Sequence, residues 1–172
     1  MFVLGVDPGV SRCGYAVLEA RPAGRARAAA IGVLTTATTE PLPLRLAELQ
    51  REVRALLGAY APAVVAIERV LFQVNVRTAM GVGQASGIVM AEAAGRGCAV
   101  VEYSPNQVKE AVAGWGGAGK EEVQRMVCTL LDLDRVPSPA DAADAAAVAL
   151  CHLAIEPLRR AAARAGTAGR VR

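Results

Sequence analysis

The sequence has a single histidine, His152, so mechanisms that need two histidines are excluded. Its four cysteines are scattered, with no CxxC pair and no histidine at zinc-finger spacing, and are expected to be reduced, mostly buried thiols. No apolar run approaches the roughly 18 residues that a membrane helix needs, and no contact with a membrane is expected. The first residues lack the basic segment and cleavage site of a signal peptide, which predicts a cytoplasmic location.

Basic residues are concentrated at the end of the chain. Residues 157–172 contain five arginines and no acid, whereas 14 basic and 16 acidic residues precede them. We therefore expect residues 1–156 to form one near-neutral domain and residues 157–172 to form a basic, flexible tail. Such a tail suits contact with a polyanion, although a solvated chain end would have the same composition.

Short apolar segments separated by turn signals occupy the first part of the chain. Residues 2–6, 14–18 and 29–34 are of this kind, and the first is followed by an Asp-Pro-Gly turn. Three strands with short connections predict an antiparallel meander. Leucines at helical spacing then predict a helix that begins near residue 46 and closes at Gly58.

Two further strand-length apolar runs, residues 63–67 and 98–103, alternate with helices in the rest of the chain. Helices are predicted over residues 77–94 and 120–131, after Ser104, and from Ser138 to about Ile155. Ser104 and Pro105 are typical of a capped helix start. Three strands followed by an α-β-α-β order predict an α/β fold, with a mixed five-stranded sheet flanked by helices on both faces.

Acidic residues follow two of the predicted strands. Asp7 ends the first, and Glu68 ends the strand over residues 63–67. In open α/β sheets, ligand sites tend to lie beyond the carboxyl ends of strands. Asp141 and Asp144 are three residues apart on a predicted helix, so they share one of its faces. If that helix end lies beside the two strands, four carboxylates come together.

Four clustered carboxylates are unfavourable unless cations neutralise them. Their oxygens are hard ligands, which indicates Mg²⁺ or Mn²⁺, and two such ions could activate a water and stabilise the leaving oxygen of a phosphodiester. Each acid also has a structural explanation when taken alone. Asp7 could be a turn residue, and Glu68 could pair with Arg69. Asp141 could cap its helix, whereas Asp144 lies in an otherwise apolar, alanine-rich segment.

Five short motifs follow one another along the chain. They are GVDPG with GY within residues 5–15, AIE at 66–68, GQA with a further glycine at 83–87, QVK at 107–109 and DAADA at 141–145. In sequence and order they resemble the RuvC family of Holliday junction resolvases, from Met1 to about His152. The resemblance implies an RNase H-like fold and an endodeoxyribonuclease that resolves four-way junctions by paired symmetric nicks in homologous recombination and DNA repair.

The resemblance also implies the roles of individual residues. The four metal-binding acids of the family correspond to Asp7, Glu68, Asp141 and Asp144, with two Mg²⁺ or Mn²⁺ ions in each active site. Two family lysines that support catalysis or junction contact match Lys109 and Lys120, the only lysines of the chain. Both could instead be ordinary cations on helix surfaces.

The segment after Glu68 is where family members insert an aromatic side chain between bases at the junction centre. The commonly aromatic position corresponds to Leu71, with Phe72 beside it, and we slightly favour Phe72 as the wedge. A core or dimer-interface role for Phe72 is the alternative. Arg69 and Arg77 flank this segment and are also expected to bind DNA.

The resemblance further implies a homodimer and, as partners, RuvA and RuvB. Small residues within 77–94 would allow close backbone approach, either between two protomers or against the sheet. Trp115 lies in a glycine-rich loop near both lysines, and it could touch DNA or close the loop onto the core.

Other functions fit parts of the pattern. Nucleotide-binding proteins of the sugar-kinase and actin kind also contain Gly-x-Asp-x-Gly, but they need a second domain and a second phosphate loop, for which this chain is too short. A non-catalytic junction-binding module would not need the complete set of acids. The shorter YqgF-like relatives share the fold, but the Asp-Ala-Ala-Asp motif, Lys109 and Lys120 favour RuvC.

Overall fold

A computed structural model describes the backbone of residues 1–69 and 76–168, and the side chains of residues 1–69 and 79–157. Its centre is a five-stranded sheet in the order β3-β2-β1-β4-β5. The first three strands, β1 (Phe2–Asp7), β2 (Arg12–Ala20) and β3 (Ala26–Thr35), are antiparallel. The other two, β4 (Val64–Glu68) and β5 (Ala99–Tyr103), extend the sheet in parallel with β1. The mixed sheet predicted from the sequence is confirmed.

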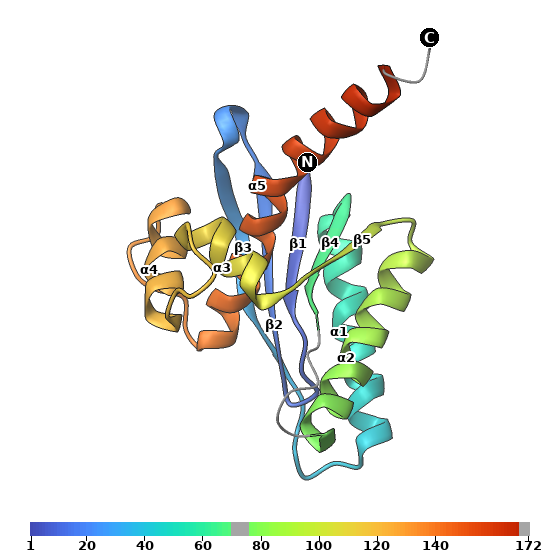
Figure 1. Cartoon of the computed structure of the whole chain (residues 1–172). Helices are drawn as coiled ribbons and strands as arrows, with labels where there is room; N and C mark the ends of the chain where they lie inside the picture. Colours follow the sequence, from blue (N-terminus) through green and yellow to red (C-terminus); the bar gives the residue numbers. More distant parts are fainter. Residues whose placement is uncertain (70–75, 169–172) are drawn as a thin grey trace.

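Helices cover both faces of this sheet (Figure 1). On one side lie α1 (Leu42–Tyr60) and α2 (Val76–Gly95), and on the other lie α3 (Pro105–Ala113), α4 (Lys120–Leu130) and α5 (Ala140–Ala168). Each side has its own buried core. The consecutive residues Val3 and Leu4 of β1 enter opposite cores, because side chains alternate between the two faces of a strand.

The helix boundaries follow the predicted signals with two differences. At the start of α3, Ser104 accepts a hydrogen bond from the backbone N–H of Gln107, and the Gln107 side chain accepts one from the backbone N–H of Ser104, which confirms the predicted cap. The predicted end of α1 at Gly58 is wrong, because the helix continues to Tyr60 and ends where Ala61 adopts a left-handed conformation. The last helix continues past Ile155 and through Pro157 to Ala168.

Two glycines allow α5 to lie directly on the sheet. A Cβ atom at Gly5 of β1 would collide with the carbonyl oxygen of Ala145, and one at Gly14 of β2 would collide with the carbonyl oxygen of Asp141. The helix surface that faces these strands is made largely of buried alanines. Because neither surface has bulky side chains here, the first turns of α5 come close to the end of β1.

The cysteines were expected to be reduced thiols, and all four are free. Among the helices in the described part of the chain, none is both long and apolar enough to cross a membrane.

Candidate active site

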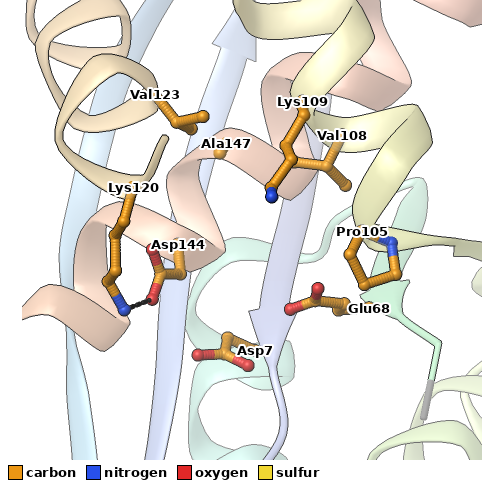
Figure 2. A pocket seen from close by; sticks show the side chains of 9 residues that line it. All are labelled: Asp7, Glu68, Pro105, Val108, Lys109, Lys120, Val123, Asp144 and Ala147. Carbon is orange, nitrogen blue, oxygen red and sulfur yellow. Dashed lines mark hydrogen bonds and ion pairs between the residues drawn. The ribbon is translucent and has the colours of Figure 1, made fainter. Parts of the chain in front are cut away.

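Asp7 and Glu68 lie side by side at one end of the sheet (Figure 2). They are the last residues of the parallel neighbours β1 and β4, in which the preceding residues, Val6 and Ile67, are Cα partners. Parallel strands end at the same edge of a sheet, so both carboxylates project from this edge. The juxtaposition that the sequence predicted for these two acids is present.

Asp144 joins them from α5, and the three acids line one cavity of about 400 Å³. The full lining consists of Asp7, Glu68, Pro105, Val108, Lys109, Lys120, Val123, Asp144 and Ala147. One wall therefore comes from the sheet and α5, and the other comes from α3 and α4 (Figure 2). Both lysines of the chain face the acids across this cavity.

The surroundings of Asp7 strongly disfavour its charged form. Its pKa is raised from 3.8 to about 7, first by burial and then by the negative charges of Glu68, Asp144 and Asp141. The positive charge of Lys120 opposes this rise without cancelling it. In the absence of a bound cation, Asp7 therefore keeps its proton to a much higher pH than an exposed aspartate does.

The pKa of Glu68 is also raised, first by burial and then by the charge of Asp144. Lys120, a hydrogen bond with Asp7 and Lys109 all act in the opposite direction. Asp7 and Glu68 are thus close enough to share a proton. Excess negative charge gathers at the cavity, and it comes from three separate elements of the fold.

Lys120 is the main counter-charge. Its Nζ donates a hydrogen bond of 2.6 Å to Oδ2 of Asp144, and this bond is the first cause of the raised pKa of Lys120. Lys109, on α3, points into the same cavity and lowers the pKa of Glu68 (Figure 2). The lysines singled out from the sequence therefore lie at the acids.

Asp141 stands apart from the other three acids. It is in the first turn of α5 but does not line the cavity, and its carboxylate is paired with the guanidinium of Arg12 at the start of β2. Its charge still reaches the cavity, since it contributes to the raised pKa of Asp7. Sequence reasoning missed Arg12, because nothing in the loop after Asp7 indicates which cation would meet a helix more than a hundred residues later.

The arrangement of the acids matters for metal binding. Among the described side chains, no group of three or more His, Cys, Asp or Glu residues is arranged to hold a metal ion. One carboxylate oxygen of Asp141 is paired with Arg12, and one of Asp144 is paired with Lys120. The chemistry of the donor set nevertheless fits Mg²⁺ or Mn²⁺, since all four groups are carboxylates and a bound cation would relieve the repulsion at Asp7.

The remaining predicted contacts can be placed only in part. Arg69, directly after Glu68, is exposed, and its backbone N–H donates to the carbonyl of Tyr103 at 2.8 Å. Arg77 belongs to α2, but its side chain is outside the described set. The two wedge candidates, Leu71 and Phe72, lie outside the described residues.

Comparison with known proteins places this geometry in a family. The model of the family "Crossover junction endodeoxyribonuclease RuvC" matches residues 3–152. A protein of this name from Leifsonia xyli is 47% identical over 150 residues, which cover 87% of this chain and 72% of the relative. Another from Moorella thermoacetica is 45% identical over 160 residues, which cover 93% of this chain and 95% of the relative.

Solved structures are similar as well. The RuvC structure from Thermus thermophilus superimposes with a TM-score of 0.86 at 37% identity, covering 92% of this chain and 96% of that one. The yeast mitochondrial Holliday junction resolvase, with 16% identity and a TM-score of 0.65, shares the fold. The sheet order and the helices on both faces are those of the RNase H-like resolvase fold. The family model matches most of this chain, which therefore belongs to the RuvC family of crossover junction endodeoxyribonucleases.

Proposed function

We propose that this chain resolves four-way DNA junctions by paired symmetric nicks, with the carboxylates at the ends of β1 and β4 as its catalytic centre. One observation carries the proposal: Asp7, Glu68 and Asp144, from three elements far apart in the sequence, line one cavity together with both lysines of the chain. Membership of the RuvC family supports the reaction. The Thermus thermophilus relative has been solved in complex with a Holliday junction, with a TM-score of 0.87 to this chain.

The proposed metal ligands are Asp7, Glu68, Asp141 and Asp144, for two Mg²⁺ or Mn²⁺ ions. Such ions, when bound, supply an activated water and stabilise the leaving oxygen of the phosphodiester. Asp7 must lose its proton to act as a ligand, so metal binding near pH 7 releases a proton from it. Asp144 and Asp141, whose carboxylates are paired with Lys120 and Arg12, would complete the ligand set.

Lys109 and Lys120 are proposed to hold the phosphate backbone of the cut strand at the acids. Both line the cavity, where their ammonium groups would attract a phosphate to the acids. Arg69, exposed beside Glu68, and Arg77, farther along, are proposed to add contacts to the DNA backbone. The wedge role of Leu71 or Phe72 stays a prediction.

We also propose that the enzyme acts as a homodimer through α2. Its exposed residues recur at helical spacing, and a Cβ atom added at Gly83 or Gly87 among them would meet no atom of another described segment within 4 Å. Met80, on the same face, is 61% exposed. A second helix could therefore approach this stripe closely. RuvA and RuvB remain proposed partners on the basis of family membership alone.

The division into a nuclease domain, residues 1–156, and a basic tail, residues 157–172, is likewise a proposal. Five arginines in the tail would add phosphate contacts that do not depend on sequence. Removal of residues 157–172 should weaken junction binding and reduce its salt dependence, by up to about one unit of slope for each lost contact. An unchanged slope would exclude the tail from binding.

A junction-binding protein without catalysis is the second candidate. The pairing of Asp141 with Arg12 and of Asp144 with Lys120 favours it, because an acid cluster with a purely structural role would be neutralised in this way. Cleavage of a labelled four-way junction separates the two. The full chain is incubated with the junction, or with a linear duplex of the same sequence, in Mg²⁺, Mn²⁺ or EDTA.

Paired nicks at symmetric positions, dependent on metal and restricted to the junction, are the expected result. Asp144→Asn should abolish them while leaving binding in EDTA intact. Asp134→Asn is the matched control, because Asp134 is an exposed acid outside the cavity. A junction that is shifted in a gel but never cut would instead support the binding protein.

A further inference from the structure

Trp115 is the only tryptophan of the chain and so its largest aromatic side chain, yet it is 54% exposed. It lies in the loop between α3 and α4, the helices that carry Lys109 and Lys120. An aromatic ring left half in water at this place loses the stabilisation that burial would provide. The closure of the loop onto the core does not need the ring, because Ala118 is the loop residue that is buried, at 1% exposure.

The exposed ring is held in one orientation. Its Nε1 donates a hydrogen bond of 3.2 Å to Oε1 of Glu122, in the first turn of α4. Its six-membered ring also lies directly against the backbone of Gly117, since a Cβ at that position would collide with it. A fixed aromatic surface loses little conformational entropy when a flat ligand binds to it.

The loop that carries the ring adjoins the wall of the acid cavity. Gly116 lies against Asn106, where a Cβ would be 3.7 Å from the carbonyl oxygen, and the residue before Asn106, Pro105, lines the cavity. On the other side, Glu122 holds the ring two residues from Lys120, which binds Asp144. One turn of α4 thus connects the ring to the acids.

The charges around the ring indicate which part of a nucleotide it would meet. The carboxylate of Glu122 repels a phosphate, whereas Lys109 and Lys120 in the cavity attract one. The uncharged base is the part that can approach Glu122 and the indole. Stacking of bases on aromatic side chains is tolerant of sequence and suits an unpaired nucleotide next to a backbone-binding groove.

We propose that Trp115 is a stacking platform for a base of the DNA strand whose backbone enters the acid cavity. This inference rests on the proposed function, because it presupposes that DNA is bound there. The ring is a positioning residue: it aligns the strand over the carboxylates and takes no part in the chemistry. The lysines contact the phosphate backbone, and Trp115 adds a contact with the face of a base.

Because the chain has one tryptophan, its fluorescence reports on this residue alone among tryptophans. The full chain is titrated in EDTA with an unlabelled four-way junction, and binding is measured in parallel by the anisotropy of a dye-labelled junction. Stacking should quench the tryptophan emission in proportion to the bound fraction. Binding by anisotropy with unchanged emission would overturn the inference and leave the proposed function standing. The absence of any binding would overturn both.

Substitution separates stacking from a structural role of the loop. Trp115→Leu should weaken binding about tenfold, whereas Trp115→Phe, which keeps an aromatic face, should stay within about threefold of the parent. The salt dependence should be unchanged, because no phosphate contact is lost. Leu130→Ala is the matched control, since Leu130 is 45% exposed at the other end of α4 and should leave binding unchanged.

Two outcomes of these variants contradict the inference. Normal binding by Trp115→Leu would show that the ring is not used. Equal losses in Trp115→Leu and Trp115→Phe, with unchanged urea denaturation, would show that the aromatic face is not what binds. A variant that unfolds is recognised by its denaturation curve, and the quenching of the parent protein then decides.

Discussion

Glu92, on α2 in contact with α1, and Asp7, at the end of β1, are acids in opposite surroundings. Glu92 accepts hydrogen bonds from Arg54 at 2.7 and 3.0 Å and from Gln50 at 2.7 Å, and these lower its pKa to about 2. At Asp7, burial and the neighbouring acids raise the pKa to about 7. At the contact between α1 and α2, neighbouring side chains thus neutralise and hydrogen-bond the carboxylate of Glu92. In the cavity, the acids carry more negative charge than the nearby lysines balance.

Under the proposed function, this difference separates a structural acid, Glu92, from a functional one, Asp7. Keeping Asp7, Glu68 and Asp144 together lowers the stability of the folded protein, because their repulsion opposes folding. Selection for stability alone would therefore remove this cluster. Sites that break the rules of packing and charge in this way are expected where function requires it. The following predictions test this distinction, beginning with the largest effect.

Asp7→Asn should lower junction cleavage in Mg²⁺ by on the order of a thousandfold or more, because an amide cannot replace the carboxylate that is proposed to bind the metal. Single-turnover cleavage of a labelled junction measures this. Glu92→Gln, a substitution of the same kind in the other region, should cleave at the rate of the parent protein. Equal losses in the two variants would remove the proposed distinction.

The stability of the metal-free protein should respond to the same substitution in the opposite sense. The pKa of Asp7 is about 7 in the folded chain against 3.8 as the ordinary value, so the folded state binds this proton more tightly. The free energy of unfolding should therefore fall as the pH rises from about 4 to about 7, and change little above that. At pH 8, Asp7→Asn should be the more stable protein, by roughly 2–4 kcal/mol.

Urea denaturation in EDTA at pH 5, 6.5 and 8 measures this effect. The advantage of Asp7→Asn should shrink toward pH 5, where Asp7 of the parent keeps its proton. Glu92 should behave in the reverse way: its stabilising contribution is present above pH 4.5 and is lost as the pH falls through about 2. Addition of Mg²⁺ should stabilise the parent more than Asp7→Asn. A stability advantage of the variant that does not depend on pH would contradict the electrostatic explanation.

Arg12→Gln should strengthen the binding of Mn²⁺, because it removes the cation that competes for Asp141. We expect a change of up to about fivefold in Kd by isothermal titration, the value of one partly exposed ion pair. Arg25→Gln removes the same charge from an exposed position on the β2–β3 hairpin, at the other end of the sheet (Figure 1), and should have no effect. Weaker metal binding by Arg12→Gln would indicate that Arg12 orients Asp141 for the metal instead of withholding it.

The smallest effect is expected for the structural acid. Glu92→Gln should lower the urea midpoint slightly at pH 7, because Glu92 pairs α2 with Arg54 of α1, and the Arg54 side chain is 55% exposed. The difference between variant and parent should decrease in high salt, which screens such a pair. A salt-independent loss would show that the hydrogen bonds of Glu92, and not its charge, matter there.

Much of the fold could be predicted from local patterns. The five strands follow from apolar runs between turn signals, and the start of α3 follows from the Ser104 cap. Gly58 misleads as a helix end because a glycine signals an end only where the backbone turns left-handed, and here Ala61 does so. The continuation of α5 through Pro157 could not be predicted either, because a proline usually ends the hydrogen-bonded pattern.

Some residues of the site could likewise be predicted from local patterns, and others could not. Asp7, Glu68 and Asp144 could be proposed from strand ends and helix spacing, and the resemblance to RuvC added Lys109 and Lys120. Arg12 could not, because its role depends on a contact between segments far apart in the chain. Arg12 meets Asp141 across 129 residues, and no local pattern encodes such a pair.

By itself the sequence determined the order of strands and helices, the oxygen-only character of the acid cluster and the family, since these depend on side-chain chemistry and short-range spacing. Tertiary structure decided which charges face one another. The close packing of α5 on Gly5 and Gly14 brings Asp144 to the strand ends, and it turns Asp141 toward Arg12. Electrostatic energy depends on distance in space, so the pKa values that set the site apart from the rest of the molecule exist only in the folded chain.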